Sequence, residues 1–103
     1  MRIIHKYVMS DGKEDRNGNF VFDLPKGAKI LSVAFQRSRL VFWADFEISC
    51  KNELEPRLLY IVGTGIPYEK GAGKLMQIGT AVTEGGDFVF HLFERIDDNY
   101  WRE

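Results

Sequence analysis

Side chains able to do chemistry are few in this chain. Histidine occurs only at His5 and His91, and cysteine only at Cys50. A single cysteine cannot form an internal disulfide, and a zinc site would have to rely on carboxylates without any recognisable ligand spacing. Neither a Ser-His-Asp arrangement nor a GxSxG motif is present. We therefore predict no metal, no cofactor and no catalytic residue.

An enzymatic interpretation can be built only around His91, which lies within FVFHLF. A buried imidazole could act as a general base if Asp45 or Glu94 held its ring in place. A lone histidine in a strand is, however, more often a packing residue. The prediction is a non-enzymatic protein, and a hydrolase that uses His91 is the enzymatic alternative.

A glycine-rich segment could accept a ligand where a strongly apolar run ends. Glycines let a ligand approach the backbone closely, although a bulge or a tight turn explains the same residues and is the more common reason for them. GAGK at 71–74 lacks the preceding glycine and the following Ser or Thr of a phosphate-binding P-loop. Two lysines could still approach a small anionic ligand. The candidate residues of this segment are Gly63, Thr64, Gly65, Lys70 and Lys74.

A second candidate surface lies within RLVFWADFEI at 39–48. In a strand, Arg39, Trp43 and Asp45 share one face. The opposite face of the same strand is apolar and carries Leu40, Phe42, Ala44 and Phe46. Trp and Arg frequently anchor protein interfaces. The alternative is a Trp that simply packs beneath the stems of basic side chains. DRNGN at 15–19 resembles part of an EF-hand calcium loop, but the acidic residues that the motif needs before and after it are absent.

Alternation of apolar and polar residues indicates strands and no long helix. The expected strands are 2–9, 19–24, 28–36, 39–48, 57–65, 75–83 and 88–96, with the last one central in its sheet. Between them we expect a polar loop at 10–19, a corner at LPKGA, a hairpin tip at Arg37-Ser38, a loop or helical turn at 49–57, a long loop at 66–74 and a turn at 84–87. Residues 96–103 could form a short helix or pack against a sheet edge.

These elements predict one β-rich domain over residues 1–103. Parallel strands need long crossovers, which are missing, so the pairing should be mostly antiparallel. We expect an all-β fold, or a β-rich α+β fold, of about seven strands, arranged as a sandwich or a partly closed barrel. Open sheet edges favour a homodimer or a higher homo-oligomer.

The net charge and the hydropathy of the chain argue against nucleic acids and membranes as binding partners. Fourteen basic and fifteen acidic residues leave a formal net charge of −1, which argues against nucleic-acid binding. The start of the chain does not have the form of a signal peptide, and the apolar run LLYIV is too short to cross a bilayer. We expect a cytoplasmic protein that does not bind membranes.

An ordered series of motifs carries a family resemblance. It comprises IIHKY, LPKGAKILSV, a Trp in the next strand, IVGTG, IGT and FVFHLFE, spread over roughly residues 3–95. The chain thereby resembles a family of small uncharacterised proteins found mainly in phages and prophages. Relatives would carry a histidine after GTG, where this chain has Ile66-Pro67.

The resemblance implies action in the cytoplasm of a bacterial host. Small phage proteins of this kind often bind a host or phage protein, to divert it or to counter a defence. The leading expectation is therefore a non-enzymatic binding protein for such a partner. The alternative is a protein that binds or sequesters a small molecule such as a nucleotide signal, and that could do so as an oligomer.

Overall fold

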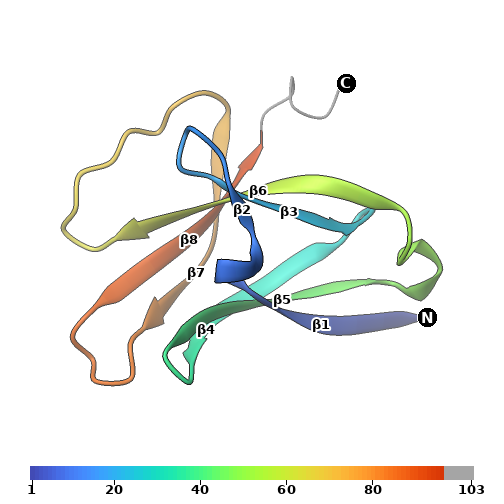
Figure 1. Ribbon diagram of the computed structural model, residues 1–103, viewed down its shortest axis with the longest axis horizontal. Coiled ribbons are helices and arrows are strands. Elements are labelled where there is room, and N and C mark those ends of the chain that lie inside the picture. The colour runs from blue at the N-terminus through green and yellow to red at the C-terminus, as the bar shows by residue number, and fades with distance from the viewer. Residues whose placement is uncertain (97–103) are drawn as a thin grey trace.

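The computed structural model describes residues 1–96, which form short and long strands but no α-helix (Figure 1). The elements in chain order are β1 (Arg2–Val8), the 3-10 helix η1 (Met9–Asp11), β2 (Lys13–Glu14), β3 (Phe20–Pro25), β4 (Lys29–Gln36), β5 (Arg39–Glu47), the 3-10 helix η2 (Ile48–Cys50), β6 (Leu54–Gly63), β7 (Lys74–Val82) and β8 (Val89–Ile96). The expectation for the tail falls on residues 97–103, outside the described part of the chain.

Two separate sheets make up the fold. Sheet A has the strand order β1-β5-β4, and sheet B has the order β2-β3-β6-β8-β7. Every pairing is antiparallel. The all-β sandwich is confirmed, whereas the barrel alternative is wrong because the two sheets do not join into a closed ladder. The strand of FVFHLF is confirmed as central, since β8 lies between β6 and β7.

One strand more than expected is present. Lys13 and Glu14 form β2, opposite Val21 and Phe20, inside the segment that we expected to be a loop. A two-residue strand cannot show alternation, so its pairing depends on the neighbouring strand and not on its own pattern. The segment that we expected to be a loop or a helical turn contains the single turn η2. Strand β6 then begins at Leu54, before the expected start at residue 57.

The core lies between the facing surfaces of the sheets. From sheet A, Phe42, Ala44 and Phe46 of β5 are buried as their alternation predicts. Sheet B contributes buried residues from β3, β6, β7 and β8. The principal members of the core cluster are Phe22, Leu24, Val33, Phe42, Ala44, Phe46, Leu59, Ala81 and Leu92. Burial of these apolar surfaces is the main force that holds the sheets together.

At one side of the sandwich the two sheets approach each other through β4 and β7. A Cβ atom added at Gly79 of β7 would lie 3.4 Å from Cγ1 of Val33 in β4, so a glycine permits this contact. Both strands also shift register, β4 between Ile30 and Ser32 and β7 between Gln77 and Gly79. Such bulges bend edge strands and make them poor templates for further pairing.

The hairpin tip at Arg37-Ser38 is confirmed. Both residues have positive φ, 50° and 67°. This matches the two-residue turns that suit the twist of paired strands, although Asn and Gly are the residues that such turns prefer. The N–H of Ser38 donates to Oε1 of Glu84 over 3.0 Å, which ties the tip to the β7–β8 turn.

An ion pair lies on the inner face of sheet B. Arg57 stands opposite the core residue Phe22, and Glu94 stands opposite the core residue Leu59. Nη2 of Arg57 donates to Oε1 of Glu94 over 2.9 Å, and Nε donates to Oε2. Nη1 donates to the carbonyl oxygen of Ala28 over 2.8 Å. The side chains are only 12% and 9% exposed, so this pair joins β6 to β8 on the inner face of sheet B, and the bond to Ala28 ties it to the corner before β4.

Candidate functional site

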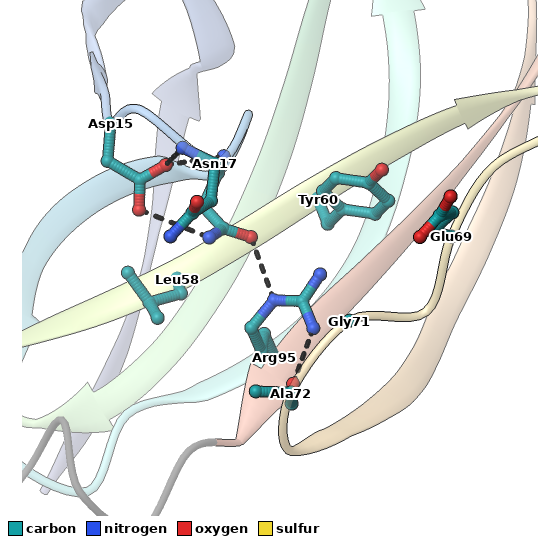
Figure 2. Close-up of a pocket in the computed structure, with 9 residues that line it drawn as sticks. Asp15, Asn17, Leu58, Tyr60, Glu69, Gly71, Ala72 and Arg95 are labelled. Carbon is teal, nitrogen blue, oxygen red and sulfur yellow. Dashed lines mark hydrogen bonds between the residues drawn. The ribbon is translucent and has the colours of Figure 1, made fainter.

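A pocket of about 440 Å³ lies on the outer face of sheet B. Its walls come from the β2–β3 loop, from the long β6–β7 loop and from the strands between them (Figure 2). The polar side chains that line it are Asp15, Asn17, Asn19, Tyr60, Glu69 and Arg95. Because these residues come from four segments of the chain, only the folded sheet brings them together.

Arg95 of β8 lies at the base of the pocket and is 7% exposed. Its Nε donates to Oδ1 of Asn19 over 3.0 Å. Its Nη1 donates to the carbonyl oxygens of Lys70 and Ala72, each over 2.6 Å. Its guanidinium carbon also lies 5.1 Å from the ring centroid of Tyr60. One side chain thus holds both loops against the sheet.

The remaining guanidinium nitrogen of Arg95 faces the pocket. Within residues 1–96, no hydrogen bond and no ion pair reaches Nη2. In the same part of the chain, every fully buried side-chain nitrogen or oxygen has a hydrogen-bond partner. Because Nη2 has no such partner there, it is not fully buried and stays open to the pocket. Figure 2 shows this nitrogen pointing towards the wall that carries Tyr60 and Glu69. The base of the pocket therefore offers a positively charged donor.

The β6–β7 loop folds back over the sheet to form one wall. Tyr68 packs against Tyr60 and Phe93, with ring centroids 6.4 Å and 6.3 Å apart. Gly71 has a φ of +73°, and a Cβ atom there would lie 3.3 Å from Nη1 of Arg95. Glycine is needed at this position both for its backbone angle and for the close approach to Arg95.

Asp15 organises the opposite wall. Its Oδ1 accepts the backbone N–H groups of Asn17 and Asn19, each over 2.9 Å, and its Oδ2 accepts Nδ2 of Asn19 over 3.1 Å. Partial burial by itself would raise the pKa of Asp15. The hydrogen bonds from Asn19 and Asn17 and the charge of Arg95 outweigh burial and hold this pKa below its usual value of 3.8. Asp15 therefore lines the pocket as a carboxylate at neutral pH.

Replacing Asp15 by asparagine should lower the free energy of unfolding by about 1 kcal/mol at neutral pH, because an amide cannot accept all three hydrogen bonds. The pKa is lowered on folding, so the carboxylate stabilises fully above pH 3.8 and loses its effect as the pH falls through the folded-state value. Urea unfolding over an acidic pH series should show the two proteins converging. Asp23→Asn, an exposed site on β3, is the control. A difference that persists in strong acid would contradict this assignment.

Of the residues that we predicted for a ligand site, Thr64 and His91 meet. Oγ1 of Thr64 lies 2.7 Å from Nε2 of His91, and Oγ1 of Thr80 lies 3.0 Å from Nδ1. His91 is therefore on the outer face of sheet B with two hydroxyl partners. The orienting carboxylates that we considered are wrong: Glu94 faces inward to Arg57, and Asp45 belongs to sheet A and bonds Arg2.

None of the residues that we predicted for this segment lines the Arg95 pocket, and only Lys70, through its carbonyl oxygen, bonds to Arg95. Gly63 ends β6, and Gly65 has a φ of +81° at the start of the loop. Nζ of Lys70 donates to the carbonyl oxygen of Gly73 over 2.6 Å, within its own loop. Lys74 begins β7 and is exposed.

Trp43 and Asp45 lie on the outer face of sheet A, on a different sheet from the pocket. Trp43 stands opposite Lys6 of β1 and Ser32 of β4, and it is half-buried. Asp45 accepts a hydrogen bond from Nε of Arg2 over 2.9 Å. Arg39 begins β5 opposite Gln36, at the hairpin end of the same strand. The two predicted surfaces are thus separate.

Metal-binding clusters and membrane-spanning helices are both absent from residues 1–96. Between residues 1 and 96, no group of three His, Cys, Asp or Glu side chains is placed to hold a metal ion. Over the same residues, no helix has the length and apolar character needed to cross a membrane.

The fold and the site define an all-β two-sheet protein with a small polar pocket on an outer sheet face. The model of one family, described as "Domain of unknown function (DUF7352)", matches residues 1–103. The chain belongs to this family, and the expected membership of an uncharacterised family is confirmed. Neither the curated proteins nor the solved structures contain a match to it.

Proposed function

We propose that this protein is a non-enzymatic binding protein whose ligand, a small polar molecule, occupies the Arg95 pocket. The observation that carries the proposal is the state of Arg95. Its Nε and Nη1 are held by neutral oxygens of both loops, and Nη2 is left facing a 440 Å³ space. Burying a charged group is costly unless polar partners surround it, so a cation kept at the base of a pocket indicates a binding role.

Enzymatic function has less support. The hydroxyl groups on both sides of His91 can fix the ring, but they are not the carboxylate that a triad-like base uses. The remaining charged pair of sheet B, Arg57 with Glu94, is mutually bonded and faces the core. The outer face of sheet B therefore supports ligand binding better than catalysis.

The binding function can be tested with a mixed panel of sugars, nucleosides, amino acids and nucleotides, using thermal shift and protein-observed NMR. We expect at least one class to raise Tm and to shift the amides of Tyr60, Gly71 and Arg95. Arg95→Lys keeps the charge but loses the fork that holds both loops, and should weaken binding about tenfold or more.

Trp43→Ala, on the other sheet, is the matched control and should leave the affinity unchanged. Circular dichroism of both variants separates lost binding from lost folding. A panel that shifts no pocket amide at millimolar concentration would contradict the proposal, as would equal affinity of folded Arg95→Lys and the unaltered protein.

A second candidate is a protein partner from a bacterial host or a phage, in line with the phage and prophage resemblance and with action in the host cytoplasm. Trp43 favours it, because this half-buried ring is accompanied by Ile4, which is 55% exposed two residues from Lys6 on the same face. Affinity purification at near-native expression would test it. A partner that is retained equally by Trp43→Ala would count against this surface.

Self-association stays a prediction. Strand β1 is an edge of sheet A and carries no bulge, unlike β4 and β7. An unprotected edge is a natural place for pairing with a second chain. Sedimentation velocity over a range of concentrations measures it directly.

A further inference from the structure

If the Arg95 pocket binds a ligand, as the proposed function requires, the groups that line it also restrict the charge of that ligand. Asp15 and Glu69 place two carboxylates beside the single guanidinium of Arg95. An anionic ligand would meet this excess negative charge, and neither lysine of the neighbouring loop is among the lining residues. A cationic ligand would meet the buried charge of Arg95. An uncharged ligand avoids both penalties.

Arg95 is also unsuited to clamp an anion. Carboxylates and phosphates are typically bound by two parallel N–H groups of an arginine fork. Here Nε and Nη1 are occupied by Asn19 and by the carbonyls of Lys70 and Ala72, which leaves Nη2 alone. The two N–H groups of Nη2 alone can donate to hydroxyl or carbonyl oxygens, but they cannot form the paired fork that a carboxylate or phosphate prefers.

The rest of the lining completes a hydroxyl-binding pattern. The side chains of Glu69 and Asn17 make no hydrogen bond within residues 1–96, so a carboxylate and an amide remain available. Figure 2 shows them on opposite sides of the space above Arg95. Planar carboxylate and amide groups can each engage neighbouring hydroxyls, which donate and accept at once. The ring of Tyr60 supplies apolar surface against which the C–H face of a sugar ring can pack.

We propose that the ligand of the Arg95 pocket is an uncharged, hydroxyl-rich ring compound, namely a sugar unit. In this arrangement Nη2 of Arg95 donates to one hydroxyl, while Glu69 and Asn17 engage others at the rim. The volume of about 440 Å³ falls within the usual range of small-molecule sites.

Protein-observed NMR titration tests this with three sets of probes: glucose, galactose, mannose, N-acetylglucosamine and lactose; the matching sugar phosphates and nucleotides; and free amino acids. We expect an uncharged sugar to shift the amides of Tyr60, Gly71 and Arg95, and its phosphate to bind more weakly. Glu69→Gln should reduce the sugar affinity about tenfold, the loss of one charge-assisted hydrogen bond.

Glu53→Gln, an exposed carboxylate before β6, is the matched control and should have no effect. Pocket shifts with only the phosphates, nucleotides or amino acids would overturn the sugar assignment and leave the binding function standing. Sugar binding that Glu69→Gln does not weaken would overturn the arrangement at the rim. If no probe shifts a pocket amide, both the sugar assignment and the proposed function fail.

Discussion

Replacing Glu94 by leucine should destabilise the protein by about 3–5 kcal/mol, because it leaves the guanidinium of Arg57 buried without its countercharge. Both hydrogen bonds between the two side chains would be lost, and only the bond from Arg57 to the carbonyl oxygen of Ala28 would remain. Domains of this size are stable by about 5–15 kcal/mol, so the variant would lose a large part of its stability. Urea denaturation followed by tryptophan fluorescence measures the change.

The double variant Arg57→Met with Glu94→Leu should recover most of that loss. Replacing a buried ion pair by apolar side chains of similar volume is often neutral or stabilising, because both desolvation penalties disappear. Arg2→Met is the control, since it breaks the exposed pair with Asp45 and should cost about 1 kcal/mol or less. A double variant that is as unstable as Glu94→Leu would contradict this account of the pair.

Phe42→Ala should cost about 3–5 kcal/mol, the range for removing a buried aromatic ring. Phe42 is 0% exposed, its ring stacks on Tyr7 with centroids 5.1 Å apart, and it meets Phe22 edge-on at 5.0 Å. It therefore joins β1 and β5 of sheet A to β3 of sheet B. The expected fall in Tm is about 12–40 °C, from about 4–8 °C per kcal/mol.

Phe88→Ala makes the same chemical change at a side chain that is 64% exposed, in the turn before β8. Its effect should lie within about 0.5 kcal/mol. Calorimetry of both variants gives the comparison. Similar losses in the two would mean that burial of Phe42 is not what determines its contribution.

The strands could be predicted from the sequence because burial follows the alternation of side chains. In β5 the pattern predicted which face Phe42 and Phe46 occupy, and the buried positions agree. The tip at Arg37 and Ser38 was predictable from its place between two alternating runs. Strand β2 was not, because two residues carry no period, and its pairing partner is several positions away.

The pocket was much less predictable. Thr64 and His91 were recognised as candidates and meet each other, but neither lines the pocket, and Arg95 was missed. A signal was present, since a central apolar strand that contains Glu94 and Arg95 must provide partners for both charges. The identity of the residues that pair with Glu94 and Arg95 depends on the cross-strand register and on the path of two loops. Arg95 and Asn19 are 76 positions apart, and no local pattern reports such a contact.

The position of Arg95 in β8 has a consequence for synthesis of the chain on the ribosome. Strand β8 pairs with both β6 and β7, so sheet B lacks the strand that joins these two, and the base of its pocket, until β8 has emerged. Chains emerge from the N-terminus at about 5–20 residues per second, and non-local strand pairing is slow to form. A ligand of this pocket therefore cannot assist the nascent N-terminal strands. Under the proposed function, such a ligand would bind only after the sheet has been completed.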